Sequence, residues 1–176
     1  IQFTEEPGSC SIAGSVAGLS NALARLLGSS HRLQSIRANP QAVNLVDAAV
    51  ARPINDSDVL DDIIDLGPVT GTVSAALGMA VRKSGRTTAT TSGQVSVLEA
   101  TVSISYGAGL NATFEKQIVT TPMSQGGDSG SLLMASSGSL AVGLLFGGSE
   151  QATIHNPIQA VLDSLDITFS VPAAAK

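Results

Sequence analysis

Hydrophobic and polar positions follow two different patterns along this chain of 176 residues. Between Ser11 and Leu27 the apolar side chains recur every three or four residues, and Gly28 follows the last of them. This spacing predicts an N-terminal helix that ends at the glycine. From residue 44 onwards, short runs rich in β-branched residues alternate with glycine and asparagine turns, which is typical of a β-barrel or β-sandwich.

The predicted strands follow one another closely in this second part. They cover residues 43–50, 69–73, 79–83, 94–106, 112–121, 132–134 and 140–146. In the longest of them, Val95 and Val97 alternate with polar residues, which predicts that the two valines share one face of the strand. Near the C-terminus, Asn156 and Pro157 suit the N-cap and the first position of a helix over residues 156–165.

Composition narrows the class of protein. Hydrophobic residues make up 43% of the chain and charged residues 13%, which indicates a compact globular protein. A net charge of -5, 3% aromatic residues and no tryptophan argue against nucleic acid or an anionic membrane as the partner. Cys10 is the single cysteine, so an internal disulfide and a cysteine-based zinc site are excluded. We expect no metal and no cofactor.

Two clusters of charge have simple interpretations. Asp58, Asp61, Asp62 and Asp65 lie close together, but their spacing matches no calcium-binding loop, so we expect a solvated acidic loop. The basic residues of 82–86 lie where one strand turns into the next, and we expect a solvated hairpin end there.

The segment Gly127-Asp128-Ser129-Gly130-Ser131 carries the strongest chemical signal. Glycine adopts backbone angles that other residues avoid, so a serine flanked in this way can lie on a tight turn with its hydroxyl exposed. The same glycines let a substrate carbonyl approach backbone N–H groups, as an oxyanion hole requires. The other common serine motif, G-x-S-x-G, would need glycine where Ser131 stands.

A serine hydroxyl is a weak nucleophile unless a base, usually histidine oriented by a carboxylate, takes its proton. Asp47 is the candidate carboxylate, because it lies within the predicted apolar strand Asn44-Leu-Val-Asp-Ala-Ala-Val-Ala51. A buried carboxylate is costly unless it has a partner, and an imidazole N–H would serve. An aspartate that closes a turn at the strand end is the alternative.

Four segments in this order resemble bacterial trypsin-like serine proteases related to the plant narrow-leaf-type proteases. They are residues 44–53, residues 78–88 (GMAVRKSGRTT), residues 120–133 (TTPMSQGGDSGSLL), and residues 141–149 (AVGLLFGGS) followed by 154–158 (IHNPI). The resemblance extends from about Asn44 to Phe169. It implies a mainly β fold: a chymotrypsin-like double β-barrel whose first barrel is incomplete here, with an N-terminal and a C-terminal helix.

The resemblance also implies a division of the chain and a function. Residues 1–43 would be a helix and connector of the first barrel, and residues 44–176 the protease domain. The function would be that of a serine endopeptidase acting on peptide or protein substrates through an acyl-enzyme. Ser129 would be the nucleophile and Asp47 the acid of the triad. The backbone N–H groups of Gly127 and Ser129 would form the oxyanion hole.

The remaining parts of the expected site follow from the same resemblance. The substrate pocket would be framed by Met123, Phe146, Gly147 and Gly148. Met123, six residues before Ser129, would lie at the pocket base, which argues against cleavage after Arg or Lys. Asp128 would point inward. In relatives that are activated by cleavage, its counterpart pairs with a new N-terminal amine, but Ile1 lacks the glycines that such a terminus needs.

The catalytic base is the open question, because the sequence has two histidines. His31 precedes Asp47 by 16 residues, in a context unlike that of the family, and is otherwise an exposed loop residue. His155 follows the serine and is expected to be a partly buried strand residue. We therefore expect the base upstream of Ile1. A pseudoprotease or protein-binding module, or an inactive processed fragment, is the alternative.

An incomplete barrel also predicts a partner. Self-association, or a partner segment that completes the first barrel, is expected because exposed strand edges pair readily. No signal peptide is visible, and both a cytoplasmic and a secreted bacterial location stay open.

Overall fold

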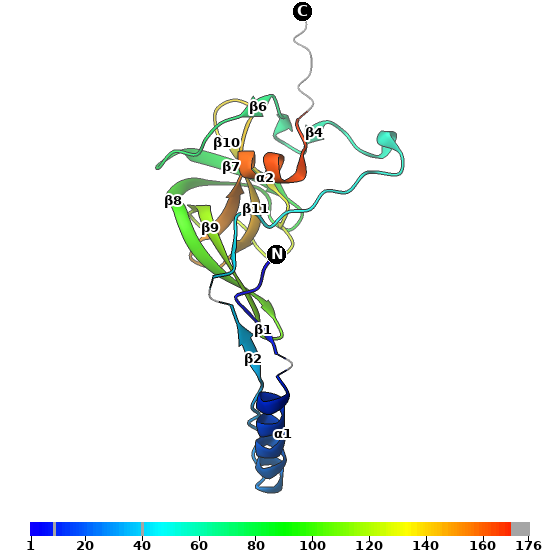
Figure 1. Ribbon diagram of the computed structural model, residues 1–176. Helices are drawn as coiled ribbons and strands as arrows, with labels where there is room; N and C mark the ends of the chain where they lie inside the picture. Colours follow the sequence, from blue (N-terminus) through cyan, green and yellow to red (C-terminus); the bar gives the residue numbers. More distant parts are fainter. Residues whose placement is uncertain (9, 40, 170–176) are drawn as a thin grey trace, which may run out of the picture. The chain divides into compact units, whose positions relative to one another are not determined.

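The computed structural model describes residues 1–8, 10–39 and 41–169. The chain divides into two compact units. The N-terminal unit consists of Ile1–Asn44 and Ser103–Phe114, and the barrel unit of Leu45–Val102 and Glu115–Lys176. The long strands β8 (Ala89–Gly107) and β9 (Leu110–Thr120) contribute to both units (Figure 1).

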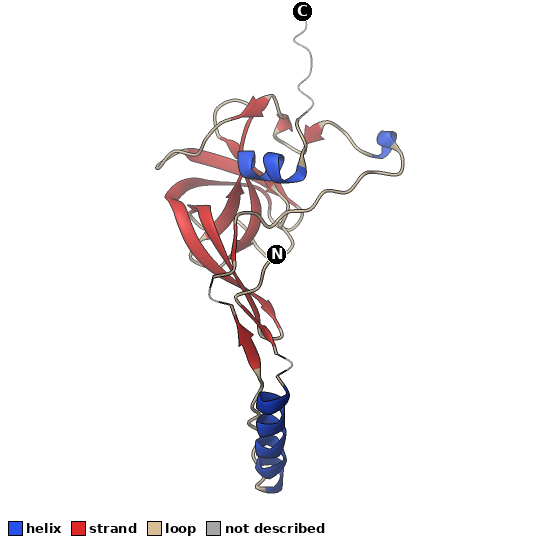
Figure 2. Cartoon of the chain, in the orientation of Figure 1, coloured by secondary structure: helices blue, strands red, loops and turns tan. Residues whose placement is uncertain are grey.

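The barrel unit is built on one closed ring of strands. β7 (Ala80–Gly85) pairs with β8 and with β10 (Leu132–Ala135), and β11 (Leu140–Gly148) pairs with β10 and with β12 (Thr153–Pro157). β12 also pairs with β9, which neighbours β8, so the ring of strands closes. Closure leaves these strands without a free edge for unwanted pairing. Figure 2 shows this unit as predominantly strand.

Apolar residues from all sides fill the barrel. The buried core consists of Val81, Val95, Ile118, Met123, Leu133, Ala135 and Val142. Val97 does not join Val95 as the alternation predicted: Val97 is 46% exposed, and Leu98 packs against the core instead. Glu99 has a left-handed backbone (φ 53°), and such an irregularity changes which residues of the strand face inward.

A second apolar cluster lies under the C-terminal helix α2 (Ile158–Leu165). Ile158 and Leu162 of this helix pack with Leu66, Met134 and Ala141. The predicted helix exists, but its start was wrong: it begins after Pro157, and Asn156 belongs to β12. Asn156 is fully buried, and its side-chain amide bonds to backbone elsewhere, so it does not cap the helix.

Four short elements precede β7 within the barrel unit. They are η1 (Asp56–Asp58), β4 (Asp62–Ile63), β5 (Gly67–Pro68) and β6 (Gly71–Thr72). β6 runs parallel to β11, and β4 pairs only with β5 among the described residues. Of the acidic residues, Asp58 lies in η1 and Asp62 in β4, whereas Asp61 and Asp65 lie at a bend and a turn; all four are exposed. The described residues contain no cluster of metal-ligating side chains.

The N-terminal unit is a small sheet with one helix. β1 (Glu5–Pro7) pairs with β2 (Ile36–Ala38), and the helix α1 (Ser11–Leu26) connects them. β1 also pairs with β9, and β3 (Val43–Asn44) runs parallel to β9. The described part of this unit contains no closed barrel. The predicted strand over 43–50 was too long, because residues 45–50 have no ladder partner.

The predicted helix near the N-terminus is confirmed, but its apolar stripe is uncovered. Ile12, Val16, Leu19, Leu23 and Leu26 are between 57% and 85% exposed. The opposite side of the helix is occupied, because Asn21 exchanges two hydrogen bonds with the backbone of Leu33 (2.7 and 2.8 Å). Within the described ranges, α1 and α2 are both too short or too polar to cross a membrane as a helix.

Candidate functional site

The loop between β9 and β10 holds Ser129 on an exposed turn. Gly127 (φ 101°) and Gly130 (φ 88°) flank the Asp128–Ser129 pair with backbone angles that favour glycine. The turn is fastened to the barrel on its C-terminal side: Gly130 N–H donates to the Leu145 carbonyl at 2.8 Å, and Leu145 N–H donates to the Ser131 carbonyl at 3.0 Å. The serine is therefore presented by a loop that β11 holds in place.

Ser129 lies on the wall of a cavity of about 740 Å³. Met123, Gly147 and Gly148, which the sequence placed around a substrate pocket, also line it. Phe146 does not, because successive residues of a strand point to opposite sides and its neighbours Leu145 and Gly147 face the cavity. A cavity of this size can take a side chain of a peptide together with adjoining backbone.

Two backbone donors next to the serine are unused. Within the described residues, the N–H groups of Gly127 and Ser129 donate to no other group. By contrast, Asp128 N–H is engaged with the Gln125 carbonyl at 3.1 Å, and Ser131 N–H with the Asp128 carbonyl at 3.0 Å. Stabilisation of an oxyanion requires unused N–H donors close to the nucleophile, and these two belong to Ser129 itself and to the residue two positions before it.

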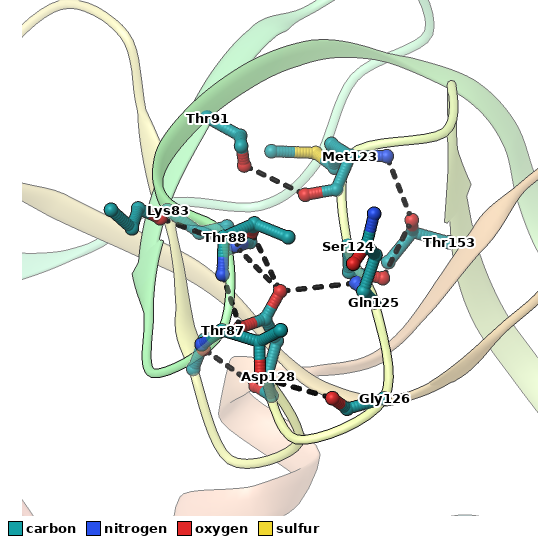
Figure 3. A network of polar contacts seen from close by, with 12 residues as sticks. Lys83, Thr87, Thr88, Thr91, Met123, Ser124, Gln125, Gly126, Asp128 and Thr153 are labelled. Atoms are coloured by element: carbon teal, nitrogen blue, oxygen red, sulfur yellow. Dashed lines mark hydrogen bonds and ion pairs between the residues drawn. The ribbon is translucent and has the colours of Figure 1, made fainter.

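The Asp128 side chain points inward, is 1% exposed, and is the centre of a polar network (Figure 3). Its carboxylate accepts hydrogen bonds from the backbone of Thr87 (2.8 Å), Thr88 (3.1 Å) and Gln125 (3.1 Å), and from the Thr88 hydroxyl (2.7 Å). Lys83 Nζ lies 3.0 Å from the same carboxylate. Burial alone would raise the pKa of Asp128, but the bonds from Thr88, Gln125, Lys83 and Thr87 outweigh it and hold that pKa well below its usual range.

Lys83 corrects the interpretation of residues 82–86 as a solvated basic turn. The side chain is fully buried, and besides Asp128 its ammonium contacts the Thr88 hydroxyl and the Ala89 carbonyl. The available signal was its position two residues after the buried Val81, because alternate residues of a strand share a face. Lys83 supplies the cation for Asp128 from within the barrel unit, so the Asp128 carboxylate has its partner without Ile1.

Gly85 shows how closely the β7–β8 hairpin approaches the serine loop. A Cβ atom built at this glycine would lie 2.5 Å from Asp128 Oδ1 and 2.8 Å from Ser131 Oγ. A side chain there would displace either the carboxylate or the loop. The hairpin and the loop that carries Ser129 are thus packed as one structure, and the shape of the loop depends on both.

Asp47 lies in the barrel unit, in the extended segment after β3, and is half-buried. Its backbone is bonded on both sides to the side chain of Asn156, at 2.9 Å in each case. The buried strand predicted around it is absent, and a side-chain amide takes the place of a strand partner. Asn156 was not identified from the sequence as part of the site, because it was assigned to the helix cap.

The two histidines occupy contrasting environments. His31 is exposed in the N-terminal unit, with Nδ1 3.5 Å from the Ser29 hydroxyl. His155 is the one histidine of the barrel unit, and it is fully buried in β12 rather than partly buried as expected. Its Nε2 lies 3.1 Å from the Thr120 hydroxyl, and it does not line the cavity beside Ser129.

The burial of His155 predicts that the free energy of unfolding decreases in acid. Burial, with a smaller contribution from the positive charge of Lys83, lowers the pKa of His155 to about 3. In the unfolded chain this pKa returns to about 6.5, so between these values the unfolded state binds one more proton than the folded state. The free energy of unfolding should therefore fall by about 1.4 kcal/mol for each pH unit from pH 6.5 towards 3 because of this side chain.

Replacing His155 with glutamine should remove that part of the pH dependence. Urea unfolding of both proteins at pH 8, 7, 6, 5 and 4 measures it, and the slopes should differ most below pH 6. Between pH 7 and 8, where the imidazole is neutral in both states, the two slopes should agree. Equal slopes below pH 6 would show that the buried imidazole is protonated in the folded protein.

The chain is similar in sequence to bacterial serine proteases. The chain is 35% identical to serine protease 1 of Streptomyces fradiae over 104 residues, which are 56% of this chain and 27% of that protein. It is also 35% identical to glutamyl endopeptidase 2 of Streptomyces griseus over 105 residues, 57% of this chain and 52% of that protein. The chain thus spans about half, or less, of the length of the curated relatives it matches.

Solved structures agree with the sequence matches. The crystal structure of Cellulomonas bogoriensis chymotrypsin superimposes with a TM-score of 0.51 at 31% identity, over 59% of this chain and 56% of that one. No protein-family model matches the chain. The predicted mainly β, chymotrypsin-like fold with a helix near each end is confirmed.

Proposed function

Given that the chain is homologous to bacterial trypsin-like serine endopeptidases, we propose that it forms the nucleophile-bearing part of such an enzyme, with Ser129 as nucleophile. The observation that carries the proposal is the Lys83–Asp128 ion pair. It is fully buried, and it fastens the loop that exposes Ser129 in the cavity. A loop held in this way is preorganised, which is the condition for strong stabilisation of an oxyanion.

The proposed reaction is acyl transfer. Ser129 Oγ attacks the peptide carbonyl carbon while a base takes its proton, and the carbonyl oxygen becomes an anion beside the N–H groups of Gly127 and Ser129. Collapse of this intermediate breaks the C–N bond, the base returns the proton to the leaving amine, and an acyl-enzyme results. Water then hydrolyses the ester by the same steps. Asp47 orients the base and stabilises its charged form.

The proposed base is a histidine from outside residues 1–176. His155, the one histidine in the unit that contains Ser129 and Asp47, is buried with Nε2 directed to Thr120. The match to only part of each relative is compatible with a base elsewhere in the full-length protein. The burial of His155, the one histidine of the barrel unit, also favours a second candidate function: a protein-binding module that kept the fold without a catalytic base.

Labelling with a fluorophosphonate probe tests the proposal. The full-length protein and the 176-residue chain are each incubated with the probe, digested and mapped. We expect modification of Ser129 in the full-length protein and little in the chain alone. Labelling of Ser129 in both would place the base within residues 1–176, with His31 the candidate. No labelling in either would favour the binding module.

Cleavage preference gives a further prediction. Met123, at the proposed pocket base, is 5% exposed and packs into the barrel core, while Thr91 and Ser124 add hydroxyl groups to the wall. Glu150 is the one carboxylate among the described lining residues, and it is exposed. We expect substrates with a small or apolar P1 residue to exceed Arg and Lys in kcat/KM. The test is a peptide panel differing at P1, and it includes Glu because one relative is a glutamyl endopeptidase. A preference for Arg or Lys would contradict the proposed pocket.

The proposed self-association involves α1. Its exposed residues Ile12, Val16, Leu19, Leu23 and Leu26 follow the alternating spacing of four and three that lets two identical helices interdigitate. Arg25 is the one charged residue of the helix, so two copies meet without strong repulsion. We therefore propose a second copy of this chain as the partner of the stripe.

Sedimentation equilibrium over a range of concentrations measures this association. We expect the unmodified chain to form a dimer, and the Leu19→Glu/Leu23→Glu variant to be monomeric because burial of two carboxylates is costly. Arg25→Glu, which changes charge outside the stripe, is the control and should still associate. A chain that is monomeric at every concentration would show that the stripe does not bind a second copy.

A further inference from the structure

Asn156 has a place in the barrel that its sequence context does not reveal. It is fully buried in β12, next to the helix α2. Its Oδ1 accepts a hydrogen bond from Asp47 N–H at 2.9 Å, and its Nδ2 donates to the Asp47 carbonyl, also at 2.9 Å. This pair of bonds is the pattern that one residue of an antiparallel strand would offer to its neighbour.

A second buried amide supports the same segment. Gln117 of β9 is fully buried, and its Nε2 donates to the Leu45 carbonyl at 2.9 Å. Residues 45–50 have no strand partner, so side-chain amides supply some of the backbone hydrogen bonds that a neighbouring strand would otherwise supply. An amide buried without a hydrogen bond is costly, so each of these side chains favours one position of the segment.

The strand β11 connects Asn156, which holds the backbone of Asp47, to the loop that carries Ser129. Asn156 is paired with Leu144 in the β11–β12 ladder, and its Nδ2 lies 3.4 Å from the Leu144 carbonyl. The next residue, Leu145, exchanges hydrogen bonds with the loop on the C-terminal side of Ser129, at Gly130 and Ser131. Two consecutive residues of one strand therefore hold both the partner of Asp47 and the loop of the nucleophile.

We propose that Asn156 is a positioning residue, which fixes the backbone of Asp47 in register with the Ser129 loop through β11. This inference rests on the proposed function, in which Asp47 orients the catalytic base. Asn156 touches neither substrate nor the base, and it acts on the reaction only through Asp47. Gln117 fastens the segment two residues earlier and is a matched comparison, because it is an equally buried amide bonded to backbone.

The test compares Asn156→Ala and Gln117→Ala in the full-length protein at a temperature where circular dichroism shows both to be folded. For Asn156→Ala we expect kcat to fall about 100-fold with KM changed less than about threefold, because a misplaced catalytic group costs rate rather than affinity. The acid limb of the pH–rate profile should move to lower pH, since a base without its carboxylate neighbour is less basic. Gln117→Ala should leave the position of that limb unchanged.

Amide hydrogen exchange supplies a readout that does not depend on activity. The Asp47 amide should exchange at least about tenfold faster in Asn156→Ala, because its acceptor is gone, while amides of the barrel strands keep their protection. Unchanged exchange at Asp47, an unmoved pH limb, or an equal effect of Gln117→Ala would each overturn the inference. Asp47→Asn separates the two proposals: if it retains full activity, the proposed role of Asp47 itself fails, whatever Asn156→Ala does.

Discussion

Replacing Ser129 with alanine is expected to lower kcat/KM of the full-length protein by about 10⁴-fold or more, because the acyl-enzyme can no longer form. Ser129 is exposed and makes no hydrogen bond within the described residues that would be lost, so the free energy of unfolding should change by less than about 0.5 kcal/mol. Hydrolysis of a peptide substrate and urea unfolding, measured on the same preparations, test the two expectations together.

Ser131 is the matched control for this variant. It lies two residues away on the same loop, is partly buried, and donates from its hydroxyl to the Asp128 carbonyl at 2.5 Å rather than lining the cavity. Ser131→Ala should cost about 1 kcal/mol of stability and no more than about tenfold in kcat/KM. An equal loss of activity in both variants would mean that the loop shape, and not the Ser129 hydroxyl, limits the reaction.

Replacing Lys83 with methionine is expected to cost about 3–5 kcal/mol in the free energy of unfolding, because it leaves the Asp128 charge buried without its cation. The four hydrogen bonds from Thr87, Thr88 and Gln125 remain, but they do not neutralise the charge. The surviving folded protein should also lose reactivity at Ser129, since Asp128 precedes it in the loop. Urea unfolding at pH 7 and the rate of fluorophosphonate labelling measure the two effects.

A double variant tests whether the loss comes from the unpaired charge. Lys83→Met/Asp128→Asn removes both charges, so it should recover part of the stability that Lys83→Met alone loses. If the double variant is as unstable as the sum of the two single variants, packing and not charge explains the effect.

The ion pair also predicts the pH window of acid loss. The pKa of Asp128 is lower in the folded protein than in the unfolded chain, where it is about 4. The unfolded chain therefore binds the proton first, and the stabilisation from this carboxylate is fully present above about pH 4 and lost as the pH falls below it. His155 acts over a higher window, so the two contributions can be separated by comparing Asp128→Asn and His155→Gln between pH 7 and 3.

Local sequence signals were sufficient for elements whose residues follow one clear period. The helix near residue 11 and most barrel strands were predicted because their apolar spacing needs no information from elsewhere in the chain. Local sequence signals were not sufficient where the position of a residue depends on a partner that is distant in the chain. Val97 is 46% exposed although the alternation suggested otherwise, and residues 45–50 have no ladder although their composition suits a strand.

The sequence by itself predicted the β-strands and the glycines that present Ser129, because apolar periodicity and glycine at a turn are local properties. The chymotrypsin-like fold was implied by the resemblance of four sequence segments to a known family. Only the tertiary structure decided that Lys83 is buried against Asp128 and that Asn156 holds the backbone of Asp47. These pairs join residues 45 and 109 positions apart in the chain. A buried polar side chain is stable only where the fold brings it a partner, and that partner cannot be read from its neighbours in sequence.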